Sequence, residues 1–318
     1  MSSNADSGAQ LAPPRVEEVS AGVYAYIQPD GTWWINNAGF VVGADRVAAV
    51  DACATEARTR RFLASIAATS GGLPVRTLVN THHHGDHTHG NYLFGDATIV
   101  AHERCREEIL AEGSPLASRL VSTGTWTEVE WGNIRSAAPF LTYTDRISLY
   151  VDDIKCEVIH VGTPAHSTND SIVWIPDRRV LFAGDLLFNG GTPFLLAGSV
   201  TGALEAVAGL KDLGAQTIVP GHGPVCGPEV IDRVLAYLHF VMDLARAGQA
   251  HGMPALEVAL AADLGEFAAL TDTERLAGNL HRAYADLAGA AHGAGIDTQA
   301  ALADMIRYNG GKPLTCRA

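Results

Sequence analysis

The stretch from Asn80 to Gly90, which reads NTHHHGDHTHG, places five imidazoles and one carboxylate within eight positions. It directly follows an apolar run, Val75 to Val79, that is typical of a buried strand. Histidine supplies neutral nitrogen ligands to zinc-like metals, and aspartate supplies an oxygen ligand. Because a loop at the end of a strand can direct alternate side chains at one point, the stretch predicts a metal site.

The spacing H-x-H-x-D-H within this loop divides its ligands between two ions. His82 and His84 can bind one ion together, and Asp86 and His87 then face a neighbouring ion. A solvated polar turn or a histidine-rich tract is the weaker alternative. An expression tag is a poor one, because tags lie at chain termini and lack this ordered spacing.

The composition is that of an ordinary globular protein, since 47% of the 318 residues are hydrophobic and 18% are charged. The formal net charge of −13 argues against non-specific binding to nucleic acid or anionic lipid. No apolar run approaches the roughly 20 residues that a membrane span needs. The five cysteines are scattered without a C-x-x-C pair, which favours reduced thiols over a disulfide framework.

The N-terminal segment, residues 1–14, is rich in Ser, Ala, Gly and Pro. It has neither a basic start nor a continuous apolar core, so it predicts a frayed tail rather than a signal peptide. We therefore expect a soluble, cytoplasmic protein that binds neither membrane nor nucleic acid.

Residues 15–226 contain two sections of short apolar runs, each with helices interspersed. The first section predicts strands at 23–27, 35–42, 46–50, 75–79 and 97–101 and helices at 55–68, 91–94 and 103–111. The second predicts strands at 146–151, 155–161, 171–175, 180–183 and 217–219 and a helix at 201–213. Two sheets packed face to face, with helices on the outer faces, is the economical α/β arrangement.

Two other segments have a different character. Residues 113–139 have weak periodicity and predict a long loop that could lie across a cleft. Residues 227–318 are rich in Ala and Leu and predict a helical C-terminal extension. That extension could form a wall of the site, cap the fold or mediate formation of a homodimer.

Three more potential ligands occur later, each in or beside the end of an apolar run: His166, Asp185 and His222. Any one of them alone is a weak signal, because a single histidine is more often structural and an aspartate at a strand end often caps a helix. In this order, and after H-x-H-x-D-H, the three together predict the completion of one metal centre.

With these ligands in place the chain resembles the metallo-β-lactamase superfamily, over about residues 20–226. The resemblance implies the αβ/βα four-layer sandwich, followed here by the helical extension. It also implies the ligands of two ions, with one carboxylate bridging. The first ion would be bound by His82, His84 and His166, the second by Asp86, His87 and His222, and Asp185 would bridge them. Zinc suits these ligands, although iron and manganese use them too.

Two metal ions roughly 3.5–4 Å apart would lower the pKa of a bridging water to about 7, and the resulting hydroxide would attack a carbonyl. The resemblance implies a catalytic role for Asp86, which would orient the nucleophile or carry a proton to the leaving group. Five further residues are expected to support the ligands or to pack nearby, namely Asp51, Thr81, His83, His89 and Thr163.

The fold and metals do not select a substrate. Residues 23–37 and 182–193 resemble those of actinobacterial metallo-hydrolases, some of which are thioesterase/cyclases of aromatic polyketide pathways. The resemblance implies release of an aromatic chain from an acyl carrier protein. Aromatic and amide side chains predict the substrate contacts, namely Trp33, Trp34, Phe188 and Phe194, with Asn37 and Asn189 binding substrate oxygens.

Two adjacent tryptophans at a hairpin tip cannot both face the core when side chains alternate with a period of two. We therefore expect one of Trp33 and Trp34 to pack inward and the other to lie over a pocket or solvent. The C-terminal helices show no obvious basic cluster of the kind that binds glutathione. Two alternatives to a thioesterase stay open: a lactone or β-lactam hydrolase, and an iron-dependent oxidoreductase or dioxygenase on the same scaffold.

Overall fold

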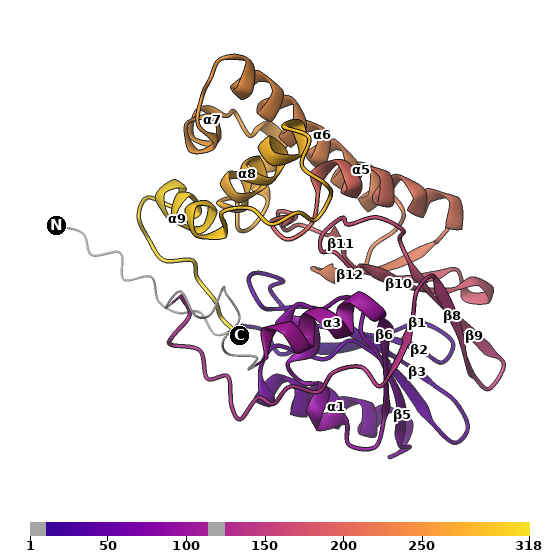
Figure 1. Ribbon diagram of the computed structural model, residues 1–318. Helices are drawn as coiled ribbons and strands as arrows, with labels where there is room; N and C mark the ends of the chain where they lie inside the picture. The colour runs from indigo at the N-terminus through magenta and orange to yellow at the C-terminus, as the bar shows by residue number, and fades with distance from the viewer. Residues whose placement is uncertain (1–10, 114–124) are drawn as a thin grey trace.

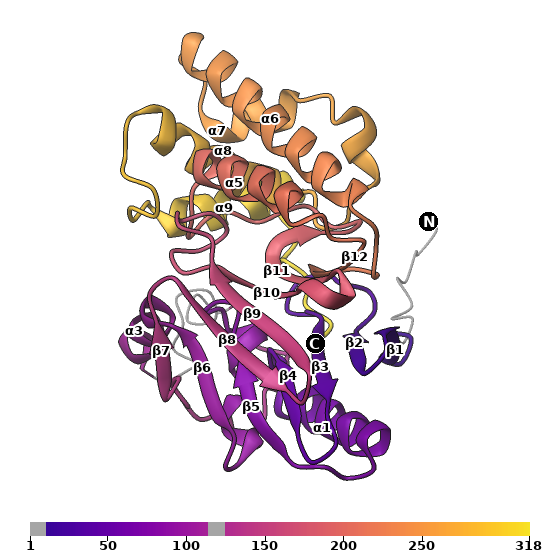
Figure 2. The same cartoon turned by 90° about the vertical axis from the view of Figure 1, so that its right-hand side faces the viewer.

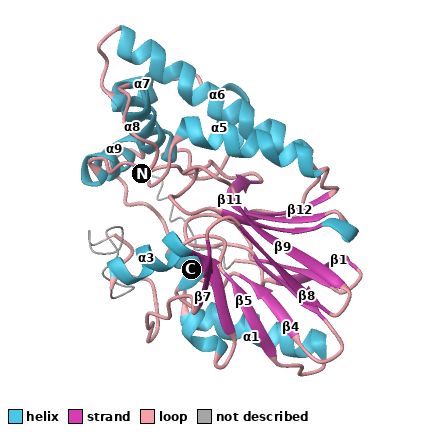
Figure 3. Cartoon of the chain, turned by 45° about the vertical axis from the view of Figure 1, so that its right-hand side comes forward, coloured by secondary structure: helices cyan, strands magenta, loops and turns pink. Residues whose placement is uncertain are grey.

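Two β-sheets packed face to face form the centre of the protein, in a computed structural model that describes residues 11–113 and 125–318 (Figure 1). Helices α1 (Glu56–Ser70) and α3 (Glu103–Glu112) lie on the outer side of the first sheet. The C-terminal helices lie on the outer side of the second sheet (Figures 2 and 3). The predicted α/β arrangement of two sheets flanked by helices, with a helical C-terminal region, is confirmed.

The first sheet has seven strands in chain order, β1 to β7. Its strands are β1 (Arg15–Ser20), β2 (Val23–Ile27), β3 (Ala38–Val42), β4 (Val47–Val50), β5 (Val75–Val79), β6 (Thr98–His102) and β7 (Leu141–Tyr143). Pairing is antiparallel from β1 to β4 and parallel from β4 to β7. The loop after β5 therefore begins at the carboxyl edge of the parallel part of the sheet.

The second sheet has five strands in the order β12-β11-β10-β9-β8. Its strands are β8 (Arg146–Val151), β9 (Ile154–His160), β10 (Ser171–Ile175), β11 (Val180–Phe188) and β12 (Thr217–His222). All neighbours are antiparallel except β11 and β12, which are parallel. The carboxyl ends of β11 and β12 consequently lie at one edge of the sheet.

The remaining helical elements fall into two sets. Within the two-sheet region these are α2 (Gly85–Thr88), η1 (Asn91–Phe94), η3 (Pro176–Arg178), α5 (Val200–Gly209) and η4 (Leu210–Leu213). The C-terminal extension contains α6 (Glu229–Ala250), α7 (Ala255–Ala261), η5 (Gly265–Ala269), α8 (Arg275–Leu287) and α9 (Thr298–Tyr308). Among the described residues, no helix combines the length and apolar character that a membrane crossing requires.

Apolar side chains cover both faces of the first sheet at β3 and β4, and these two strands carry no polar side chains. Val41 of β3 packs between the sheets with Val173 and Phe182 of the second sheet. The next residue back, Phe40, points to the other face and packs with Phe62 of α1, their ring centroids 6.2 Å apart. Alternation along the strand thus fills two separate cores.

The C-terminal extension shares a core with the second sheet. Leu181 and Ile218 of that sheet belong to one apolar cluster with Val230 of α6 and Leu280 of α8. After α9 the chain returns to the first half, where the Arg58 guanidinium donates to the Arg317 carbonyl oxygen (3.0 Å). The extension is therefore bound to the two-sheet region at both of its ends.

Several predicted boundaries differ from those of the structure. Strands β1 and β7 were not predicted, because β1 lacks apolar alternation and β7 has only three residues. Strand β3 begins at Ala38 rather than at residue 35, and β11 continues past residue 183 to Phe188. The predicted tail at residues 1–14 and the loop at 113–139 lie partly outside the described residues.

Candidate metal centre

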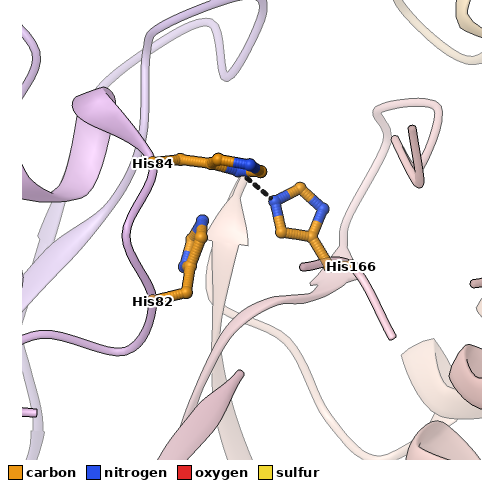
Figure 4. Close-up of side chains that lie close together, drawn as sticks. All are labelled: His82, His84 and His166. Carbon is orange, nitrogen blue, oxygen red and sulfur yellow. Dashed lines mark hydrogen bonds between the residues drawn. The ribbon is translucent and has the colours of Figure 1, made fainter. Parts of the chain in front are cut away.

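The first group of candidate ligands brings together two loops that are far apart in the sequence (Figure 4). His82 and His84 lie in the loop between β5 and α2, and His166 lies between β9 and β10. Their ligand nitrogens are all within 4.8 Å of one another, and His84 Nδ1 is 2.7 Å from His166 Nε2. Three imidazoles that converge in this way match the nitrogen ligands of a zinc-like ion.

The second group lies beside the first and includes two carboxylates. Asp86 and His87 lie on α2, Asp185 lies on β11, and His222 ends β12. Their ligand atoms also lie within 4.8 Å of one another. His222 Nε2 is 3.3 Å from Asp86 Oδ2, and His87 Nε2 is 3.0 Å from Asp185 Oδ1.

Asp185 lies between the two groups. One of its oxygens is 3.3 Å from Nε2 of His166 in the first group and 3.3 Å from Nε2 of His222 in the second. The absence of a side chain at Gly221 leaves room for the Asp185 carboxylate, because a Cβ at residue 221 would lie 1.9 Å from Asp185 Oδ1. The structure thus brings all seven predicted ligands together, with Asp185 in the place of a bridging carboxylate.

Three of the candidate ligand histidines, His82, His87 and His222, are oriented through the ring nitrogen that faces away from the site. His87 Nδ1 is 2.8 Å from Asp51 Oδ2, and the same carboxylate accepts hydrogen bonds from the backbone N–H and hydroxyl of Thr81. Thr81 Oγ1 is in turn 3.1 Å from His82 Nδ1. His222 Nδ1 donates to the Gly31 carbonyl oxygen at 3.1 Å. Such partners fix the tautomer and direction of a ligating imidazole.

The other three residues expected to support the ligands, Thr163, His83 and His89, lie outside both ligand groups and have separate partners. Thr163 is placed elsewhere, with its hydroxyl 3.1 Å from a nitrogen of His292 in the extension. His83 belongs to neither ligand group, and its Nδ1 is 3.0 Å from the Asn169 amide nitrogen. His89 also lies outside both groups, and its ring stacks on Trp34 at 5.6 Å.

The charges of the two groups differ. Burial lowers the pKa of His82 and of His84 well below the usual histidine value, so both rings are neutral. Burial alone would also lower the pKa of His87 and His222, but Asp185 and its neighbouring carboxylates raise the pKa of His87 well above normal and that of His222 to about 9. The second group thus holds protons where a divalent cation would supply the same charge, and metal binding would release them.

These residues fit two metal ions of the zinc type. The first group offers neutral nitrogens, and the second offers nitrogens together with carboxylate oxygens. His82 Nε2 is buried and makes no hydrogen bond with any residue in 11–113 or 125–318, as expected of a nitrogen reserved for a ligand ion. His82, His84 and His166 would hold one ion, and Asp86, His87 and His222 the other, with Asp185 between them.

The two groups open into a cavity of about 520 Å³. Four of the six predicted substrate contacts line it, namely Trp33, Trp34, Phe188 and Phe194. Both tryptophans are buried and both line the cavity, so the expectation that they point to different environments is wrong. They do not lie on a strand, and Trp34 has a positive φ of 66°, so strand alternation does not apply.

The other two predicted contacts, Asn37 and Asn189, lie outside the cavity lining, which corrects their assignment. The Asn37 amide donates to the carbonyl oxygens of Pro220 (2.9 Å) and Gly223 (2.6 Å) and so holds the His222 loop. The Asn189 amide donates to the Pro224 carbonyl oxygen at 2.9 Å. Both side chains form part of the scaffold.

Charged side chains that were not predicted also line the cavity. Glu108 and Glu112 come from α3, and Arg275 and Arg282 come from α8 of the extension. Burial, with a smaller contribution from Glu108, raises the pKa of Glu112 to about 7. The absence of an obvious basic cluster in the extension was thus a misleading signal, because two separated arginines on one helix reach the cavity.

Residues 31–222, more than half of the chain, match the family model described as the Metallo-beta-lactamase superfamily. The chain belongs to this superfamily. The resemblance stated from the ligand pattern is confirmed at that level. Among solved structures, a metallo-beta-lactamase from Pontibacter korlensis matches with a TM-score of 0.59. It covers 71% of this chain and 99% of its own, at 18% identity, and so shows the shared fold alone.

Three curated proteins that are similar to this chain are named for three different activities. The alpha subunit of 2,4-dinitroanisole O-demethylase from Nocardioides sp. is 27% identical over 60% of this chain and 54% of its own length. The human acyl-coenzyme A thioesterase MBLAC2 is 28% identical over 49% of this chain and 59% of its own length. Hydroxyacylglutathione hydrolase from Rhodospirillum rubrum is 30% identical over 51% of this chain and 52% of its own length. The chain spans about half the length of these relatives.

Replacing Asp51 by Asn is expected to weaken metal binding at the second group by about 10- to 100-fold, because it removes the negative charge that orients His87. Asparagine tolerates the left-handed backbone at this position, where φ is 59°. Titration of metal-free protein with zinc against a competing chelator measures the effect. Asp152→Asn is the control, since Asp152 has a similar φ of 54° and is exposed. Equal affinities in the two variants would contradict the prediction.

Proposed function

We propose that the chain is a zinc-dependent hydrolase of acyl thioesters, acting on an aromatic or polyketide-type acyl group presented by a carrier such as an acyl carrier protein. The observation that carries the proposal is the aromatic cavity that opens directly onto both ligand groups. Its volume of about 520 Å³ lies in the range of sites that enclose a small organic ligand.

When bound, two metal ions would polarise the thioester carbonyl and lower the pKa of water to about 7. The residues of the chain supply position and proton transfer. Asp86 lines the cavity and has one oxygen 3.3 Å from His222 Nε2, so its carboxylate is placed to orient a nucleophile or to carry a proton to the leaving thiolate.

The aromatic side chains account for the acyl specificity. Phe188 stacks on His222 with ring planes 3° apart and centroids 4.9 Å apart, so its ring joins the cavity wall to the second ligand group. Phe194 meets Trp33 edge to face at 4.9 Å. A flat acyl group could make the same offset and edge contacts with these rings.

The names of two relatives support a thioester over other bonds. One is an acyl-coenzyme A thioesterase and another a hydroxyacylglutathione hydrolase. A superfamily member from Bacteroides fragilis that matches over a shorter stretch, 28% of this chain, is instead named a metallo-beta-lactamase. The experiment must therefore compare bonds directly.

Steady-state rates for four substrates test the proposal: an aromatic acyl thioester, an acetyl thioester, an aryl lactone and a chromogenic β-lactam. We expect kcat/KM to be highest for the aromatic thioester, with two zinc ions per chain by elemental analysis. A higher kcat/KM for the lactone or β-lactam would overturn the thioester assignment. A single iron ion with oxygen consumption would overturn the hydrolase assignment.

Replacing Phe194 by Leu is expected to lower kcat/KM for an aromatic thioester by roughly 2- to 10-fold, because aromatic contacts contribute about 0.5–1.5 kcal/mol. The rate for an acetyl thioester should stay within about two-fold, since a small acyl group does not reach the ring. Phe267→Leu is the matched control. Its ring packs on Tyr237 at 5.4 Å and does not line the cavity. An equal loss for both substrates would contradict the role of Phe194.

A further inference from the structure

Helix α8 of the extension carries three buried polar side chains on one face. Arg275, Asn279 and Arg282, here called the α8 polar row, are spaced i, i+4 and i+7 and therefore lie on the same side of the helix. Their exposed fractions are 2%, 0% and 1%. Buried polar groups of this size persist only when their hydrogen bonds are made, so the positions of their partners indicate what they do.

Each member of the α8 polar row bonds to the backbone of residues 192–196, which connect β11 to α5. The donated bonds run from Arg275 to the Thr192 oxygen (2.9 Å), from Asn279 to the Pro193 oxygen (2.8 Å) and from Arg282 to the Leu196 oxygen (2.7 Å). Asn279 Oδ1 also accepts from the Leu195 N–H at 3.0 Å. One helix face thus holds nearly every peptide group of this segment.

The same segment orients His166. His166 Nδ1 donates to the Phe194 carbonyl oxygen at 2.5 Å, which leaves Nε2 as the nitrogen that faces His84. The Phe194 carbonyl and the Leu195 N–H belong to one planar peptide unit. His166 and Asn279 therefore bind the two ends of the same peptide group, and rotation of that group would break both bonds.

Arg282 connects this segment to a second part of the cavity wall. Besides the Leu196 oxygen, its guanidinium donates to the Ala294 carbonyl oxygen at 2.8 Å. Leu196 and Ala294 both line the cavity. Arg275 in turn lies over the Trp33 ring, with its guanidinium carbon 4.1 Å from the ring centroid. The α8 polar row thus contacts the metal ligand support and the cavity wall together.

We propose that the α8 polar row positions His166 for metal binding, so that the C-terminal extension completes the first ligand group. Asn279 fixes the peptide group of Phe194 and Leu195, and Arg275 and Arg282 fix the carbonyl groups of Thr192 and Leu196 on either side of it. The proposal rests on the proposed function only in that the ligand groups bind zinc. A role confined to packing the extension would not require hydrogen bonds to the peptide that His166 contacts. The row members are positioning residues, since none is a candidate ligand.

The affinity of each ligand group for Zn²⁺ is measured separately, with metal-free protein and a chromophoric chelator. A His222→Ala background leaves the first group intact, and a His84→Ala background leaves the second. Adding Asn279→Ala to the first background is expected to weaken zinc binding by about 10- to 100-fold, the range for lost ligand support. Adding it to the second background is expected to change affinity by less than about two-fold.

His281→Ala is the matched control, because His281 lies on the same helix and bonds to Asp304 of α9 (2.8 Å) rather than to residues 192–196. Asn279→Gln keeps both the acceptor for the Leu195 N–H and the donor to the Pro193 carbonyl oxygen, and is expected to restore most of the affinity. Where Asn279→Ala does not fold by circular dichroism, Arg282→Lys gives the same comparison, since lysine keeps the charge without the fork of donors.

Two results would overturn the inference: a first-group affinity equal to that of His281→Ala, or an equal loss at both groups. The first would show that the peptide needs no support, and the second that the helix acts only on general stability. A failure of the proposed function can be distinguished from a failure of this inference. A protein that binds zinc as described but hydrolyses no thioester would contradict the proposed function alone, and one that binds no zinc would contradict both.

Discussion

Treatment with a strong chelator is expected to lower the hydrolytic rate of the protein by at least about a thousand-fold. Metal ions contribute several kcal/mol of transition-state charge stabilisation in sites of this kind, and about 4 kcal/mol corresponds to three factors of ten in rate. In the second ligand group the neighbouring carboxylates raise the pKa of His87 and of His222, which favours protonation of both rings when no cation is bound. Those protons replace the lost charge but cannot polarise a carbonyl as a Lewis acid does.

Restoration by single metals completes the chelation experiment. Zinc is expected to return full activity, and separate additions of manganese and iron(II) determine whether the site discriminates among them. Removal of zinc should also lower the free energy of unfolding, by about 4 kcal/mol where the free ion stands at a thousand times its dissociation constant. Undiminished turnover by protein that contains no metal would contradict the dinuclear centre.

The convergence of the seven candidate ligands could be predicted from the sequence, because metal chemistry restricts residue types and strand ends restrict position. His82, His84, Asp86 and His87 are adjacent in the chain, so their spacing alone indicates a shared site. His166, Asp185 and His222 are distant, and only the order of the pattern connected them. The structure brings the seven candidate ligands together because the loops after β5 and β9 meet the carboxyl-terminal parts of β11 and β12 at this site.

The substrate contacts were less predictable, because an amide side chain has no preferred partner type. Asn37 and Asn189 bond to carbonyl oxygens of residues 220–224, and nothing local in the sequence distinguishes such a partner from a substrate oxygen. Trp33 and Trp34 line the cavity as predicted, but the expectation that they point to different environments was wrong for another reason. Trp34 adopts a left-handed backbone conformation, which an inferred strand alternation does not allow.

The C-terminal extension shows a third limit. Its Ala/Leu-rich composition predicts packing, and this is correct for most of α8, yet three polar residues on one face serve another segment. Spacing of i, i+4 and i+7 for Arg275, Asn279 and Arg282 was the available signal. What this spacing indicates depends on which backbone lies opposite the row, and that is decided by the tertiary packing of α8 against α5 and α6.

Replacing Asp86 by Asn is expected to lower kcat by about 10²- to 10⁴-fold while both metal ions remain bound, which is the range for loss of a group that transfers a proton. Burial alone would raise the pKa of Asp86, but His87 and His222 hold it well below its usual range. The group is therefore ionised at neutral pH and can accept a proton or align a nucleophile. Asparagine keeps the shape and one oxygen but loses the charge.

Metal content decides how the Asp86→Asn result is understood. Two ions per chain with a lowered kcat and an unchanged KM would assign the loss to the chemical step, because binding of the substrate would be intact. One ion per chain would instead identify Asp86 chiefly as a ligand of the second group, where its oxygen lies 3.3 Å from His222 Nε2. Asp212→Asn, an exposed carboxylate, is the control. An unchanged kcat with two ions bound would exclude a catalytic role for Asp86.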